Sequence, residues 1–182
     1  MGQPKALLPF RGGTFVSVLA ETLSTCCSPV YAVFGFDAER LMKSAPASVV
    51  AVENPDYRNG MLTSLQAALR ELRAVRELPE RILFTLVDHP ALQRETVRAL
   101  FRSSDAAIVI PRFTGKRGHP VIMRREIALE VMTEPVTSKL NHVLDRHADE
   151  THYIDVDDPG VRDDIDDPQL YRDLLTREGA RV

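Results

Sequence analysis

Four segments of the sequence combine charged side chains with glycine or proline, as ligand-binding loops commonly do. They are residues 1–10, 54–65, 86–90, and a basic stretch at 112–120 taken together with an acidic stretch at 155–167. Lysine can neutralise a phosphate, aspartates can hold a divalent cation, and glycine lets the backbone approach a ligand closely. These residue types therefore indicate phosphate and metal chemistry, although each segment also has a simpler structural interpretation.

The first two segments could bind an anion. Lys5 follows Gly2 and Pro4 near the start of the sequence, where its charge could face either a phosphate or water. Gly60 precedes a stretch with helical periodicity, so the amide groups that open this helix could receive an anion or a base. The structural alternative is an ordinary turn that enters the helix, with Ser64 in solvent.

The third segment places a carboxylate at the end of an apolar run. Leu86 and Val87 lead directly into Asp88, His89 and Pro90. An aspartate at the end of a strand can hold Mg²⁺, whose remaining ligands are usually phosphate oxygens and water. The alternative is that Asp88 caps the helix that follows, and the residues alone do not separate the two.

The fourth pair of segments sets basic residues against acidic ones. The basic stretch with its two glycines suits an anionic substrate, and the seven aspartates of the acidic stretch suit a metal. Asp155, Asp157 and Gly160 fall at positions one, three and six of a calcium loop. Pro159 at position five and Asp166 in place of the final glutamate exclude such a loop. Solvated turns and helix caps are the alternative for most of these aspartates.

Several common catalytic motifs are absent from the sequence. It contains no Gly-x-Gly-x-x-Gly fingerprint, no Walker loop, no Gly-x-Ser-x-Gly elbow, and no cysteine and histidine spacing typical of zinc. The sequence therefore has no candidate for nucleophilic catalysis by the protein itself.

Composition places the chain among ordinary globular proteins. Its 182 residues, 44% hydrophobic and 27% charged, suffice for one core, so we expect a single domain over residues 1–182. A net charge of −3 argues against binding to nucleic acid or to an anionic membrane. No apolar run approaches the ~18 residues that span a bilayer, and no signal peptide is recognisable. The adjacent Cys26 and Cys27 fit a reducing compartment, so we expect a cytoplasmic protein.

The four segments need a scaffold, and short apolar runs alternate with amphipathic stretches along the sequence. Strands are expected at 30–34, 49–52, 81–87, 107–110, 120–123 and 152–156. Helices are expected at 15–23 after a Thr14 cap, and at 61–72, 93–101, 125–132, 137–146 and 168–177. This alternation is typical of an α/β domain with a mostly parallel sheet, in which ligands bind at the carboxyl ends of the strands.

In this order the segments resemble the MobA-like NTP transferase family of nucleotidyltransferases, and especially its molybdenum cofactor cytidylyltransferase branch. The matching stretches are Met-Gly-Gln-Pro-Lys-Ala-Leu-Leu at 1–8, the nucleotide-side segment at 54–65, Asp-His-Pro at 88–90, Arg-Gly-His-Pro at 117–120 and Asp-Ile-Asp-Asp-Pro at 164–168. The resemblance implies a three-layer α/β/α fold with a mostly parallel, twisted, Rossmann-like sheet.

The resemblance also implies a reaction. A nucleoside monophosphate would pass from an NTP, CTP more than GTP, to a phosphorylated acceptor, molybdopterin in this branch, with release of pyrophosphate. A phosphate acceptor is already an ionised nucleophile, so such a site needs positioning and charge neutralisation more than a general base. The family further implies Mg²⁺ as the cofactor, and a molybdoenzyme or its chaperone as a protein partner.

By resemblance, each motif has a role. Lys5 and Asp88 would be catalytic, and Asp88 and Asp166 would hold Mg²⁺. The nucleotide would be bound by Lys5, Asn54, Gly60 and Ser64, and the acceptor by Arg117, Gly118 and His119.

The sequence departs from the family pattern at its start. The family's first strand and most of its Gly-rich triphosphate loop, on the order of a dozen residues, precede the point that matches Met1. We expect a gene start placed too late rather than an evolved loss. We also expect the sheet to lack its first strand, and the 182-residue chain to bind CTP or GTP poorly.

Two other functions fit the same segments. The acceptor could be a sugar phosphate or another small phosphorylated molecule, because the motifs specify phosphate chemistry better than acceptor identity. The chain could also be a noncatalytic nucleotide-fold module that binds a cofactor for a partner enzyme.

Overall fold

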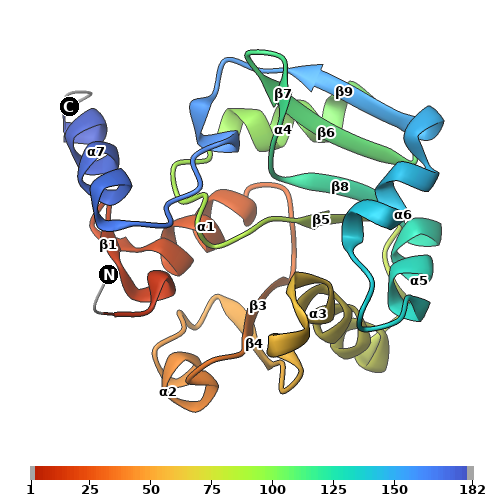
Figure 1. Ribbon diagram of the computed structural model, residues 1–182, viewed down its shortest axis with the longest axis horizontal. Helices are drawn as coiled ribbons and strands as arrows, with labels where there is room; N and C mark the ends of the chain where they lie inside the picture. Colours follow the sequence, from red (N-terminus) through yellow and green to blue (C-terminus); the bar gives the residue numbers. More distant parts are fainter. Residues whose placement is uncertain (1–2, 180–182) are drawn as a thin grey trace.

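The computed structural model describes residues 3–179, over which strands and helices alternate (Figure 1). The strands are β1 (Pro9–Phe10), β2 (Gly13–Thr14), β3 (Val30–Phe34), β4 (Val49–Glu53), β5 (Arg81–Phe84), β6 (Ile108–Phe113), β7 (Lys116–Arg117), β8 (Val121–Arg124) and β9 (Thr151–Asp155). The helices are α1 (Phe15–Leu23), α2 (Ala38–Lys43), α3 (Met61–Val75), α4 (Arg94–Ser103), α5 (Arg125–Thr133), α6 (Leu140–Arg146) and α7 (Pro168–Gly179). Short 3₁₀ turns are η1 (Lys5–Leu7), η2 (Tyr57–Asn59), η3 (Ala148–Glu150) and η4 (Pro159–Val161).

The expected strands and helices are present, and some of their ends are shifted. The strand expected over 81–87 ends at Phe84, because the next partner in its ladder would be Pro120, which has no N–H to donate. The helix expected over 137–146 begins at Leu140, because the N–H of Ser138 donates to the carbonyl of Pro135 in a separate turn. The Thr14 cap is confirmed, with a reciprocal side-chain bond from Ser17.

Two small features were not expected from the sequence. Helix α2 has six residues and the β1–β2 hairpin has two residues in each strand. Elements this short contain less than two helical turns or one full strand alternation, so they leave no periodic pattern to detect.

The strands form two main sheets. β3 and β4 pair in parallel, from Val30 opposite Val49 to Phe34 opposite Glu53. The larger sheet has the order β5–β8–β6, with β9 and the short β7 also paired to β6. β8 is antiparallel to both of its neighbours, so β5, β6 and β9 run in one direction. The sheet thus contains the expected parallel pairs, β3–β4 and β6–β9, and is mixed because β7 and β8 run antiparallel to their neighbours.

Successive side chains of the larger sheet face two helical layers. Ile108 and Met123 pack in one core with residues of α3, α5 and α6. Val109 and Ile122, one position along the same strands, pack on the opposite face with Leu100 of α4. This alternation follows from the two-residue period of a strand and confirms the three-layer α/β/α architecture.

The C-terminal segment returns to the beginning of the described chain. Helix α7 lies beside β1 and α1, and the hydroxyl of Tyr171 donates to the carbonyl of Pro9 at 2.6 Å (Figure 1). The acidic stretch immediately before α7 is thereby brought next to Lys5. Over the described range, no helix has both the length and the apolar character needed to cross a membrane.

Candidate active site

Asp88 lies just beyond the carboxyl end of β5 and begins the candidate site. Residues 85–87 carry the chain out of the sheet, and the Asp88 side chain is 19% exposed. Its Oδ2 is 3.4 Å from the Nζ of Lys5. Its Oδ1 is buried and accepts no hydrogen bond from residues 3–179. A buried carboxylate oxygen without a donor is costly, so this atom is available to a ligand.

The carboxylates of Asp164 and Asp166 lie near Asp88 because Ile165, the residue between them, is anchored in the core. Ile165 is buried in the core beside Phe10 and Phe15, and its N–H donates to the backbone carbonyl of Asp88 at 3.0 Å. With Ile165 directed inward, Asp164 and Asp166 on either side of it are left beside Asp88. One oxygen of each of the three carboxylates lies within 4.8 Å of the others.

Lys5 is held among these carboxylates. It pairs with Asp88 and with the largely exposed Asp166. Burial by itself lowers the pKa of Lys5, but the hydrogen bonds and charges of Asp166 and Asp88 outweigh it and raise the pKa. The same ammonium holds the pKa of Asp166 below its usual range.

The pKa of Asp164 is shifted in the opposite direction from that of Asp166. Burial, followed by repulsion from Asp88 and Asp166, raises the pKa of its carboxyl group. Three close carboxylates of this kind are stabilised by additional positive charge. Oxygen donors are also the ligands that Mg²⁺ and other hard divalent cations prefer. The donor set therefore fits a divalent metal, held by Asp88, Asp164 and Asp166.

Close backbone contacts at Gly118 and Gly160, here called the joint, hold the acidic stretch beside Asp88. A Cβ atom at Gly118 would lie 2.1 Å from the carbonyl oxygen of Val161, and one at Gly160 would lie 2.6 Å from the backbone of Ala91. His119 also donates its N–H to the carbonyl of Val161 at 2.8 Å. The turn η4 is thus enclosed by backbone on both sides, and only glycine fits at Gly118 and Gly160.

Asp158 fixes the same turn from within. Its side chain is almost completely buried and accepts from the N–H of Gln93, the hydroxyl of Thr96 and the N–H of Gly160, at 2.7 to 3.0 Å. These donors lie at the start of α4 and in η4. Asp158 therefore ties the acidic stretch to the helix that follows Asp88 and has no free oxygen for a ligand.

Three other aspartates of the acidic stretch have structural partners. Asp155 pairs with Arg112, and Asp163 pairs with Arg177. Asp167 accepts from the N–H groups of Gln169 and Leu170 in the first turn of α7. Only Asp164 and Asp166 of this stretch approach Asp88.

The predicted nucleotide-side residues form a second cluster at the start of α3. The amide nitrogen of Asn54 donates to the hydroxyls of Thr63 and Ser64 at 2.9 and 3.0 Å, and Asn54 is 2% exposed. Gly60 precedes the helix with φ +106°, a conformation that favours glycine. The buried Asn54 therefore holds this loop through its hydrogen bonds, and Gly60 and Ser64 lie at the surface of the loop.

The predicted acceptor residues lie in two different surroundings. The ring of His119 packs edge-on against Phe84 and lies 5.0 Å from the ring of His89, centre to centre. Burial, with the charge of His89, lowers the pKa of His119 to about 4, so its ring is neutral at physiological pH. Its Nδ1 has no partner among residues 3–179. Arg117 is exposed and lies 3.9 Å from Asp145 on α6.

The structure thus brings some predicted residues together and separates others. Lys5, Asp88 and Asp166 form one cluster, and the ring of His119 lies beside His89, the residue after Asp88. Arg117 instead pairs with Asp145, and Gly118 packs against Val161. Met1 and Gly2 of the first motif lie outside the described residues. The sequence analysis did not include Asp164 in the candidate metal site, although the spacing of two aspartates around one apolar residue was a signal for it.

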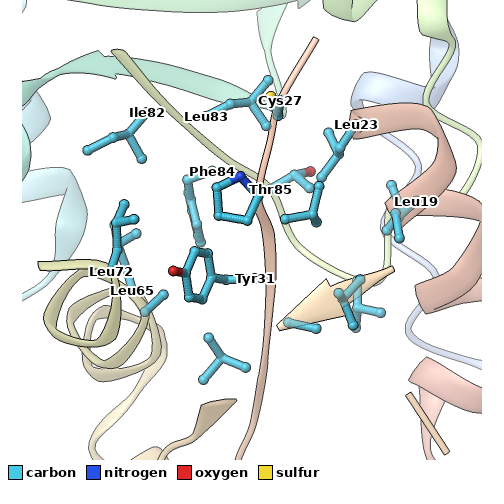
Figure 2. Close-up of a pocket in the computed structure, with 18 of the residues that line it drawn as sticks. Leu19, Leu23, Cys27, Tyr31, Leu65, Leu72, Ile82, Leu83, Phe84 and Thr85 are labelled. Atoms are coloured by element: carbon cyan, nitrogen blue, oxygen red, sulfur yellow. The ribbon is translucent and has the colours of Figure 1, made fainter. Parts of the chain in front are cut away.

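A cavity of about 650 Å³ connects the two clusters. Asp88 and Ser64 both line it, and its walls include residues of β3, β5, α1 and α3. Figure 2 shows Tyr31 and Phe84 facing this space between Leu65 of α3 and Leu19 of α1. A ligand that touches both clusters would therefore lie across the carboxyl ends of β3 and β5.

Comparison with known proteins gives a consistent family. The family model described as MobA-like NTP transferase domain matches residues 1–151. The molybdenum cofactor cytidylyltransferase of Escherichia coli K12 is 25% identical over 171 residues, which cover 92% of this chain and 85% of that protein. The nicotine blue oxidoreductase of Paenarthrobacter nicotinovorans is 36% identical over 133 residues, 66% of this chain and 62% of that protein.

A solved structure shares the fold. The complex of Rv0371C from Mycobacterium tuberculosis H37Rv with manganese superposes with a TM-score of 0.70 at 21% identity, and the match covers 95% of this chain and 91% of that one.

Proposed function

Because the chain belongs to the MobA-like NTP transferase family, we propose that it transfers a nucleoside monophosphate from CTP to a phosphorylated acceptor at the Asp88 cluster. The observation that carries this proposal is the meeting of Lys5 with Asp88, Asp164 and Asp166 at the carboxyl end of β5. Positive charge beside metal-binding oxygens is what a triphosphate and its leaving pyrophosphate require.

In the proposed reaction, an oxygen of the acceptor phosphate attacks the α-phosphorus of CTP. The bond between the α-phosphorus and the bridging oxygen breaks, and pyrophosphate leaves with the electron pair. Lys5 would offset the charge that grows on the pyrophosphate. A bound Mg²⁺, held by Asp88, Asp164 and Asp166, would supply charge neutralisation of phosphate oxygens.

The remaining predicted residues take positioning roles in this proposal. Gly60 and Ser64 border the nucleotide at the start of α3, and Asn54 holds that loop through Ser64. The neutral His119 offers a hydrogen bond and no charge on the acceptor side. Arg117 would meet an acceptor only after leaving Asp145, and Gly118 acts through the joint with Val161.

Molybdopterin is the proposed acceptor, and a molybdoenzyme or its chaperone the proposed protein partner. The relative from Escherichia coli, whose name specifies both cytidylyl transfer and the molybdenum cofactor, supports this choice. A manganese complex in a protein of the same fold supports a divalent metal, with Mg²⁺ proposed here. A cytoplasmic location and a single domain over residues 1–182 remain proposals of the same kind.

The experiment is an assay of pyrophosphate release with Mg²⁺, molybdopterin, and each of the four NTPs at millimolar concentration. We expect release that depends on the acceptor and is fastest with CTP. Asp88→Asn should lower the rate on the order of 100-fold, since it removes a metal oxygen and a partner of Lys5. Asp155→Asn, which loses only a surface pair with Arg112, is the matched control.

Three outcomes would contradict the proposal. Full activity of Asp88→Asn would exclude the cluster as the active site, and equal rates with a sugar phosphate would assign a different acceptor. Oxidation or reduction of nicotine blue by this chain, without pyrophosphate release, would favour the chemistry named for the relative from Paenarthrobacter nicotinovorans.

A further inference from the structure

A small cavity lined by arginines, the arginine groove, lies near the amino end of β5. Its volume is about 290 Å³, and its lining residues are Arg73, Arg76, Glu77, Leu78, Arg125 and Leu129. They come from the end of α3, from the loop that leads to β5, and from the first two turns of α5. Asp88 follows the opposite, carboxyl end of β5, so the groove is separate from the candidate active site.

The segments that carry these arginines are joined to one another by the fold. α3 and α5 lie side by side, and the amide nitrogen of Gln66 on α3 donates to the carbonyl of Val131 on α5 at 2.9 Å (Figure 1). The N–H of Arg125 donates to the carbonyl of Glu80 in the loop at 3.0 Å. Leu78, in the same loop, is 2% exposed. The framework of the groove is therefore in place before a ligand binds, which lowers the cost of binding.

The positive charge of the groove is only partly balanced. Nη1 of Arg125 pairs with Glu77 at 2.6 Å. Within residues 3–179, neither Arg73 nor Arg76 forms an ion pair with a carboxylate. Nε of Arg125 is buried and has no hydrogen-bond acceptor in the same range. Three arginines thus share one glutamate, and this excess of positive charge favours an anion with at least two negative charges.

We propose that the arginine groove binds a compact oligophosphate, of which pyrophosphate is the smallest. A guanidinium group donates parallel hydrogen bonds to the oxygens of a phosphate or a carboxylate. A carboxylate presents its two oxygens in one plane, whereas a terminal phosphate presents three acceptor oxygens in different directions. Guanidinium groups that converge from two helices and a loop are therefore matched better by phosphate.

The size and the charged surroundings of the groove limit the ligand. A volume of about 290 Å³ lies just below the usual range for small-molecule sites, which suits a short phosphate chain. The exposed Glu80 beside the groove and the net charge of −3 disfavour an extended polyanion such as nucleic acid. The two linked phosphates that fit here occur both in free pyrophosphate and in a nucleotide.

The test is calorimetry on the full chain with pyrophosphate, in a low-salt buffer freed of divalent metal by a chelating resin. Without a metal, the carboxylates of Asp88, Asp164 and Asp166 repel pyrophosphate, so binding in this buffer reports on the groove. The result is therefore independent of the proposed transfer reaction. We expect one pyrophosphate per chain, with an affinity that falls as the salt concentration rises. Absence of binding would overturn the proposal.

A first pair of variants locates the binding. Arg73→Gln should lower the affinity for pyrophosphate about tenfold, because it removes one guanidinium contact with phosphate. Arg70→Gln, one turn earlier on α3, is the matched control, since Arg70 contacts Gln66 and does not line the groove. Equal losses of affinity in the two variants would overturn the proposal, because they would indicate attraction by surface charge alone.

A second pair of variants changes the affinity in the opposite direction. Glu77→Gln should raise the affinity for pyrophosphate about threefold or more, because it removes a negative charge and frees Nη1 of Arg125. Glu80→Gln removes the same charge outside the groove and should leave the affinity nearly unchanged. An unchanged or lower affinity in Glu77→Gln would contradict the proposed position of the ligand.

Two further ligands identify the chemistry. Citrate carries a similar charge on planar carboxylates and should bind at least about tenfold more weakly than pyrophosphate. Equal binding of citrate would overturn the assignment to phosphate. CTP, titrated in the same metal-free buffer, distinguishes a nucleotide from free pyrophosphate as the source of the phosphates. A loss of about tenfold in Arg73→Gln with either phosphate ligand supports the groove as the site.

Discussion

The two halves of the sheet differ in how completely their strands are paired. β8 is bonded along both edges, and the residues of β6 and β8 that face the helices are almost fully buried. β3 and β4 form only a two-stranded pair, and β3 faces a cavity. An isolated two-stranded pair is marginal in water, so the β3–β4 half depends on α2 and α3 for its stability.

This difference separates two contributions to the candidate site. The larger sheet carries Asp88 just beyond the end of β5, and the joint at Gly118 and Gly160 holds Asp164 and Asp166 against it. The β3–β4 half carries Asn54 at the end of β4. The candidate metal-binding groups therefore belong to the larger sheet and the segment packed on it, and the candidate nucleotide-side groups belong to the β3–β4 half.

The largest expected effect is a loss of stability on substitution inside the larger sheet. Ile122→Ala removes a side chain that is 1% exposed between β6 and α4, and should lower the free energy of unfolding by about 2–5 kcal/mol. Ile82→Ala, in β5 beside the cavity, should cost less than about 2 kcal/mol, because its side chain already borders open space. Urea denaturation measures both, and equal losses would contradict the contrast between the interior of the larger sheet and its edge at the cavity.

The second prediction concerns the joint, at the contact of Gly160 with the backbone of Ala91. Gly160→Ala adds a Cβ against the backbone of Ala91 and should cost about 1–3 kcal/mol, because backbone rather than a flexible side chain must move. The same change should weaken metal binding by Asp164 and Asp166. Gly179→Ala, where a Cβ would meet nothing within 4 Å, is the control. Unchanged stability of Gly160→Ala would show that η4 is not held as described.

The sequence was sufficient to predict the paired half and part of the site. Apolar runs located β5, β6, β8 and β9, and the position of Asp88 after such a run indicated its role. The sequence could not separate the acidic stretch into a buried structural Asp158 and the candidate metal-binding pair Asp164 and Asp166, because that depends on contacts with α4 and Asp88. Gly118 was assigned to the acceptor for the same reason, since its contact with Val161 spans more than forty residues.

The smallest expected effect is on stability and comes from His147, at the end of α6. Hydrogen bonds with Glu150 and Glu130 raise the pKa of His147 above its ordinary value. A raised pKa in the folded state stabilises the fold below pH 6.5, and this contribution disappears as pH rises through the folded value. His147→Gln should therefore lose stability at pH 5.5, by less than about 1 kcal/mol, and almost none at pH 8.5. Denaturation at both pH values tests this, and a larger loss at pH 8.5 would contradict it.

Titration with Mn²⁺, followed by calorimetry on the full chain, tests the metal site most directly. We expect one Mn²⁺ per chain, competed by Mg²⁺, with an affinity that falls about tenfold or more in Asp88→Asn and in Asp164→Asn. Asp155→Asn, whose carboxylate pairs with Arg112, should bind Mn²⁺ as the unaltered chain does. Undiminished Mn²⁺ binding by both Asp88→Asn and Asp164→Asn would contradict the assignment of this cluster as the metal-binding centre of the proposed transferase.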